Sequence, residues 1–310
     1  MKGVGVIKYL SKYVPVKTLD QIYKIYVRPH LDFCDIIYHI PEKLDLFSSK
    51  INLSFWMEKV EKVQFHAALA VTGTWKTTSR EKIYDELGWE PICRRRWFRR
   101  LVQFFKIQNG LTPAYLKGPV PPLHSHLYGL RSNNILQPLR CNRSIFKNSF
   151  YPSASEEWNN IGPEFSQIQT LSKFKSEILK LIRFPKRSIY DLHDPLYIRR
   201  LFQLRVGLSP LRYHKRGFRD NPTTTCSCNA STETTEHFLL NCTQFTVARN
   251  SMLQVINPIL AIHNLHLANE DLSEFLLYGN DILTFEENKT VLYETLRFIK
   301  ISTRFDSTSE

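Results

Sequence analysis

The sequence predicts a mainly α fold, with a helical first part, an irregular α+β middle, and a small Cys/His module followed by a helical tail. Two observations predict it. Apolar residues recur at helical spacing through most of the chain, whereas short β-like runs fall within residues 110–166, which are rich in Pro, Gly, Ser and Asn. We expect four regions: 1–118, helical; 119–185, an irregular α+β connection; 186–245, a basic helix plus the Cys/His module; and 246–310, an acidic helical tail.

Three helices are expected in the first ninety residues. The first runs from Thr18, as N-cap, to Pro29, with an apolar stripe at Leu19, Ile22, Tyr23, Tyr26 and Val27. The second covers residues 55–72, starts its apolar pattern at Phe55 and ends at Gly73. The third begins near Ser79 and stops at Gly88.

The next helix, about residues 91–109, combines a core face with many arginines. Pro91 suits its first turn and Gly110 closes it. The predicted core face is Trp97, Leu101, Phe104 and Phe105, and the predicted basic ridge is Arg95, Arg99 and Lys106.

Shorter elements follow. Residues 136–140 and 144–146 are expected to be short strands or extended loops, and Trp158 lies in a short helix that starts near Ser153. Further helices are expected over residues 170–183, over residues 198–205 with a stop at Gly207, and within the acidic segment 243–310.

Charge is distributed unevenly along the chain. The formal net charge is +13, yet residues 221–310 hold 5 Lys/Arg and 11 Asp/Glu, and the first 220 hold 37 and 18. A basic body suggests a polyanion such as RNA or DNA, because phosphate neutralisation is the commonest use of such a surplus. The alternative is a solvated basic surface that aids solubility.

Three of the six cysteines cluster with a histidine. Cys226 and Cys228 are separated by one residue, His237 follows after eight residues, and Cys242 follows after four more. Three thiolates and one imidazole can complete a tetrahedral Zn²⁺ shell, so a structural Zn²⁺ is expected here. The alternative is unmetallated thiols beside a polar helix residue, because Cys-X-Cys is shorter than the usual Cys-X2-Cys.

Basic and aromatic residues alternate in two helical stretches, 94–106 and 199–219. Guanidinium groups neutralise phosphates and aromatic faces stack on bases, so the candidate nucleic-acid-binding residues are Arg95, Arg99, Arg100, Arg200 and Arg205. The alternative for either helix is that the aromatic residues form core and the arginines a solvated face.

The sequence offers little that could serve as an active site. Asp32 and Asp35 could share a helix face as two metal-binding carboxylates of a nuclease, although such a pair is more often a cap and a surface charge. Gly-rich phosphate loops and common hydrolase motifs are missing. The N-terminus has no long apolar core and no run approaches the ~18 apolar residues of a membrane span. We therefore expect a nuclear or cytoplasmic protein that is neither secreted nor in contact with a membrane.

Several short motifs follow one another in a fixed order along the chain. They are residues 19–35, 60–73, 84–96, 105–116, 130–132, 146–150, 158–161 and 201–209, and then Cys226, Cys228, His237 and Cys242. Their order resembles the C-terminal part of non-LTR (LINE-like, jockey-type) retrotransposon reverse transcriptases, which share similar patterns after the catalytic palm.

The resemblance implies a thumb-like role for residues 17–110 and a knuckle that binds template RNA or target DNA. The endonuclease, fingers and palm that would precede Leu19 are missing, as is the Tyr/Phe-Ala-Asp-Asp turn that holds two Mg²⁺ ions. We therefore expect a non-catalytic nucleic-acid-binding remnant of an RNA-directed DNA polymerase. The alternative is a host zinc-containing interaction module whose acidic tail docks a protein partner.

Overall fold

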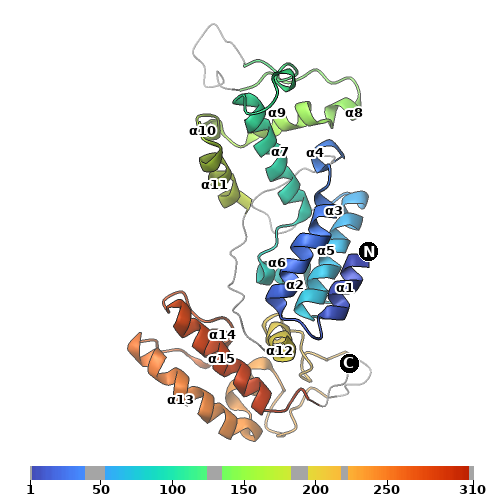
Figure 1. Ribbon diagram of the computed structural model, residues 1–310. Coiled ribbons are helices and arrows are strands. Elements are labelled where there is room, and N and C mark those ends of the chain that lie inside the picture. Colours follow the sequence, from blue (N-terminus) through green and yellow to red (C-terminus); the bar gives the residue numbers. More distant parts are fainter. Residues whose placement is uncertain (1, 39–52, 124–134, 183–194, 218–222, 307–310) are drawn as a thin grey trace. The chain divides into compact units, whose positions relative to one another are not determined.

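The computed structural model describes residues 2–38, 53–123, 135–182, 195–217 and 223–306 (Figure 1). They are mainly helical, which confirms the predicted fold class, and their only β-pairing is two isolated bridges, Leu123 with Leu136 and Thr225 with Thr232. The chain divides into two compact units. Unit 1 combines residues 1–25, 65–87 and 187–310, and unit 2 combines residues 26–64 and 88–186.

Unit 2 is built around the long helix α7. Trp97, Leu101, Phe104 and Phe105 of this helix are all buried, so the predicted core face is confirmed. The ring of Phe105 stacks 4.4 Å from Phe174 of α11, and Trp158 of α9 lies against both. The helices of this unit are α3 (Arg28–Asp32), α4 (Asp35–Tyr38), the first part of α5 (Phe55–Thr72), α7 (Ile92–Gln108), the 3-10 turn η2 (Ala114–Leu116), α8 (Ser144–Lys147), α9 (Phe150–Asn160), α10 (Pro163–Ser166) and α11 (Leu171–Ile182).

Unit 1 gathers its core around α15, which packs against α12, α13 and α14 (Figure 1). Phe238 joins this core through ring contacts with Phe245, Phe298 and Phe305. The helices of this unit are α1 (Lys2–Leu10), α2 (Val16–Ile22), the first part of the π-helix η1 (Tyr23–Val27), the last part of α5, α6 (Arg80–Leu87), α12 (Pro195–Arg205), the π-helix η3 (His237–Asn241), η4 (Thr243–Phe245), α13 (Thr246–Ile262), α14 (Asn269–Tyr278) and α15 (Phe285–Ile301).

The first predicted helix needs correction. It begins at Val16 after Pro15, two residues before the predicted cap, and the π-helix η1 continues it. Pro29 does not end the helical path, because it occupies the first turn of α3, where the missing N–H is not needed. The wider π turn also shifts the buried stripe to Leu19, Tyr23 and Val27, and leaves Tyr26 exposed.

Two other expectations were wrong. Residues 144–146 are not extended, because Lys147 N–H donates to Arg143 C=O and closes the single helical turn of α8. Such short apolar runs do not distinguish a strand from a helix. Phe55, expected to start an apolar stripe, is 68% exposed. Within the described ranges, every helix is too short or too polar to cross a lipid bilayer.

Candidate metal centre

A tight hairpin presents the first two cysteines. Glu233 N–H donates to Thr224 C=O and Cys226 N–H donates to Ser231 C=O, each at 2.9 Å. At the tip, Asn229 has a φ of 60° and donates its N–H to Cys226 C=O. Asn tolerates this left-handed conformation better than most residues. Cys226 therefore opens the turn and Cys228 lies within it, so both thiols belong to one short loop.

The π-helix η3 presents the other two candidate ligands. His237 begins it, and the N–H of Cys242 donates to His237 C=O at 2.7 Å. The wide turn closes over five residues, so both side chains face the same side of the helix. The predicted spacing of His237 and Cys242 thus brings them to one point.

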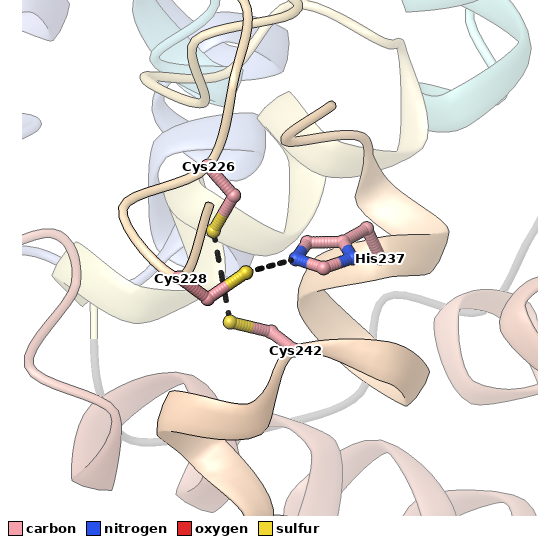
Figure 2. A group of neighbouring side chains, drawn as sticks. All are labelled: Cys226, Cys228, His237 and Cys242. Atoms are coloured by element: carbon pink, nitrogen blue, oxygen red, sulfur yellow. Dashed lines mark hydrogen bonds between the residues drawn. The ribbon is translucent and has the colours of Figure 1, made fainter. Parts of the chain in front are cut away.

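Side chains of Cys226, Cys228, His237 and Cys242 converge, with one ligand atom from each and all four atoms within 4.8 Å of one another (Figure 2). Cys226 Sγ lies 3.6 Å from Cys242 Sγ, and Cys228 Sγ lies 3.2 Å from His237 Nε2. A tetrahedron with metal–sulfur arms of about 2.3 Å has edges of about 3.8 Å. The cysteines form no disulfide. The cluster could therefore hold a metal ion, as the sequence predicted.

The surroundings of the cluster shift the pKa values of three candidate ligands, and not all in the same direction. Burial raises the pKa of the Cys242 thiol to about 12. The backbone N–H of Ala230 lowers the pKa of Cys228, and burial lowers the pKa of His237, which keeps its ring neutral at pH 7. Without a metal ion Cys242 is therefore a neutral thiol at pH 7, and it would lose its proton on coordinating a cation.

Two arginines outside the predicted site tie the ligand loops to the helical core. Arg249 of α13 donates to Leu239 C=O and Cys242 C=O, each at 2.7 Å. Arg304 donates to both carboxylate oxygens of the buried Glu233, at 2.6 and 2.8 Å. Local sequence patterns do not reveal these residues. Arg304 lies 71 residues from its partner Glu233, and Arg249 binds main-chain carbonyl groups, which carry no residue-type signature.

The predicted arginines on α7 are mostly buried. Arg95 is 5% exposed and its guanidinium donates to Asp32 Oδ1 at 2.8 Å and to Gln64 Oε1 at 3.0 Å. Arg100 is 2% exposed and pairs with both carboxylate oxygens of Glu157. Arg99 is the exception, with a side chain 38% exposed, although it too pairs with Asp32 and Asp35.

Both predicted arginines on α12 are also enclosed. Arg200 is 3% exposed and donates to Gln203 Oε1 at 2.9 Å. The side chain of Arg205 is 7% exposed, donates to Leu277 C=O and pairs with Glu86. In this structure these groups are enclosed and have internal partners, which gives the prediction that Arg95, Arg100, Arg200 and Arg205 contact nucleic acid no support.

Asp32 and Asp35 lie close together, but arginines surround them. Arg95 and Arg99 bind the Asp32 carboxylate, and Arg99 also pairs with Asp35. Burial raises the pKa of Asp35, against the opposing effect of Arg99. Guanidinium groups therefore already pair with both carboxylates that a two-metal site would need, which gives the nuclease alternative no support.

Comparison of the chain with protein-family models, with curated proteins and with solved structures finds no match. The resemblance to non-LTR reverse transcriptases therefore remains an expectation from sequence motifs.

Proposed function

We propose that this chain is a non-catalytic nucleic-acid-binding protein, related to the C-terminal part of non-LTR reverse transcriptases, with a knuckle that Zn²⁺ orders. The convergence of Cys226, Cys228, His237 and Cys242 carries the proposal. We use "knuckle" for residues 223–245.

Zn²⁺ is the metal that the donor set favours. Three thiolates and one imidazole form a closed tetrahedral shell, which is typical of structural zinc sites and leaves no position for substrate. Three thiolates with one Zn²⁺ leave a net negative charge. Arg249 and Arg304 interact electrostatically with Cys242, so they partly offset that charge.

Cations beside the knuckle support nucleic acid as the partner. Residues 211–217 lie against the hairpin, because Arg212 donates its N–H to Glu233 and its guanidinium to Thr225 C=O. Arg216 is exposed and its guanidinium lies 4.3 Å from the ring centroid of Tyr213. Glu233 is already paired with Arg304, so it offsets little of this positive charge. A cationic segment with an aromatic ring suits phosphates and bases.

Metal analysis tests the zinc component. Full-length chain purified without chelator should contain about one Zn²⁺ per chain, and Cys242→Ser should lose it. Cys141→Ser, which changes a free cysteine of unit 2 outside the cluster, is the control and should keep the metal. Folded wild-type chain without zinc would overturn this component.

Equilibrium binding of a fluorescent RNA oligonucleotide to the zinc-loaded full chain, over a series of salt concentrations, tests the partner. Affinity should fall steeply, with a slope of about −0.7 in log affinity against log salt for each phosphate contacted. Binding that is absent or insensitive to salt would instead favour the protein-interaction module. The exposed carboxylates Glu270, Asp271 and Glu274 of α14 would then be candidates for its docking surface.

A further inference from the structure

One stretch of the chain has no acidic residue. Residues 91–155 contain eleven Lys/Arg and no Asp or Glu. The arginines Arg95, Arg99 and Arg100 of α7 are paired with carboxylates from other parts of unit 2. Farther along the stretch, Lys117, Arg140, Arg143 and Lys147 are exposed and form no ion pair with any carboxylate in the described ranges.

Three of these cations lie on adjoining surface segments of unit 2. The hydroxyl of Tyr151, at the start of α9, donates to Leu116 C=O in η2 at 2.8 Å. Helix α8 packs against α9, and Ser149 Oγ donates to Phe146 C=O at 2.7 Å (Figure 1). Lys117 directly follows η2, whereas Arg143 and Lys147 stand at the two ends of α8.

Aromatic rings are exposed on the same segments. Tyr115 of η2 is 77% exposed and Phe146 of α8 is 47% exposed. The Tyr115 hydroxyl interacts electrostatically with that of Tyr151, which places η2 beside α9 at this point as well. We call Tyr115, Lys117, Arg143, Phe146 and Lys147 the η2–α8 surface.

We propose that the η2–α8 surface binds single-stranded nucleic acid. Lys117, Arg143 and Lys147 contact phosphates, and Tyr115 and Phe146 stack on bases. Unpaired strands are favoured over duplexes because a duplex hides the faces of its bases, and stacking on exposed rings requires those faces. The proposal rests on the proposed function, since it assigns a surface to the nucleic acid in place of the buried arginines.

Charge removal tests the phosphate contacts in the zinc-loaded full chain. The probe is a fluorescent twenty-nucleotide oligouridylate, measured over a salt series. Lys117→Ala, Arg143→Ala and Lys147→Ala together should reduce the steepness of the salt dependence by about 2, because each phosphate contact on a single strand contributes about 0.7. Lys76→Ala, Lys82→Ala and Lys173→Ala remove three exposed charges elsewhere and form the matched control.

Ring removal tests stacking. Tyr115→Ala with Phe146→Ala should weaken oligouridylate binding by at least about fivefold per ring, the lower end of base–aromatic stacking. The same variant should bind an abasic strand as the wild type does, because that strand offers phosphates without bases. Tyr13→Ala with Tyr293→Ala removes two other exposed rings and is the control.

The outcomes separate the two proposals. Absence of salt-sensitive binding by the wild type would overturn the proposed function. If the wild type binds and both surface variants and both controls keep its affinity, the η2–α8 surface alone would be overturned. The stacking component would be overturned if the ring variant lost as much affinity for the abasic strand as for oligouridylate. It would also be overturned if the wild type bound a duplex of the same length equally tightly. Circular dichroism and zinc content establish that each variant is folded.

Discussion

His237 can ligate a metal only if its ring is neutral and correctly turned. Its Nε2 faces Cys228 Sγ at 3.2 Å, and its Nδ1 lies 2.7 Å from Ser231 Oγ. With Nε2 as the ligand atom, Nδ1 must carry the proton and donates it to the Ser231 hydroxyl. Partners of this kind fix the tautomer and the orientation of a metal-binding imidazole.

We therefore expect Ser231→Ala to weaken Zn²⁺ affinity by about 10- to 100-fold while all four ligands remain, because the imidazole loses its orienting partner. Competition with a chromophoric chelator measures the affinity. Ser227→Ala is the matched control, since Ser227 lies in the same hairpin but donates to Gln244 instead. Equal affinity of the two variants would show that Ser231 does not orient the histidine.

Sequence patterns located the four candidate ligands, because their identity and spacing carry the information. They did not locate Ser231, Arg249 or Arg304. Ser231 and Arg249 contact groups nearby in the chain, but nothing in their residue type marks such a supporting role, and Arg304 lies 71 residues from Glu233. The burial of the arginines on α7 was not predicted either, because the carboxylates that pair with them lie far away in the sequence. Helical spacing cannot tell that Asp32 and Glu157 lie opposite Arg95 and Arg100, so buried ion pairs resembled a basic ridge.

At the scale of elements, helices were predicted best where both ends carry local signals. Gly73 follows α5, Gly88 follows α6, and α7 runs between Pro91 and Asn109 just before Gly110, so each break is encoded in backbone chemistry. The π-helices η1 and η3 were not predicted, because an extra residue in a turn has no residue-type signature of its own.

Helix α15 starts with a capping box that depends on pH. Thr284 Oγ1 accepts from Glu287 N–H, and Glu287 accepts from Thr284 N–H. Hydrogen bonds from His263 and then Thr284 lower the pKa of Glu287 from 4.5 to about 2. A carboxyl group with a depressed folded-state pKa contributes stability above its unfolded pKa, and that contribution is lost as pH falls toward the folded value.

Wild-type chain should therefore resist urea more than Glu287→Gln at neutral pH, and this difference should shrink as pH falls from about 4.5 to about 2. Urea midpoints followed by circular dichroism at several pH values measure it. Glu286→Gln is the control, because it removes an equal charge from the same turn outside the capping box, where Glu286 has only an exposed ion pair with Lys289. Acid release of zinc affects all three chains alike. A difference that stays constant with pH would contradict the assignment.

At the scale of the whole molecule, the four regions expected along the sequence do not coincide with the two compact units of the structure. Unit 1 joins three separate segments, with Gln203 of α12 donating to Gly73 C=O and Arg205 pairing with Glu86 of α6. The expected boundary at residue 245 lies between the knuckle and the helices that enclose it. Phe238 packs on Phe298 and Phe305, and Glu233 is held by Arg304.

This arrangement predicts that the metal ligands alone are not sufficient. A chain truncated after residue 245 keeps Cys226, Cys228, His237 and Cys242, yet it loses Arg249, Arg304 and the two phenylalanines that pack on Phe238. We expect it to hold zinc far more weakly than a control truncated after residue 306, because loss of Arg304 leaves the Glu233 carboxylate unpaired and the ligand loops without a core. Chelator competition on both chains measures this. Equal affinity would instead support an independent knuckle over residues 186–245, and would make the acidic helices a separate appendage.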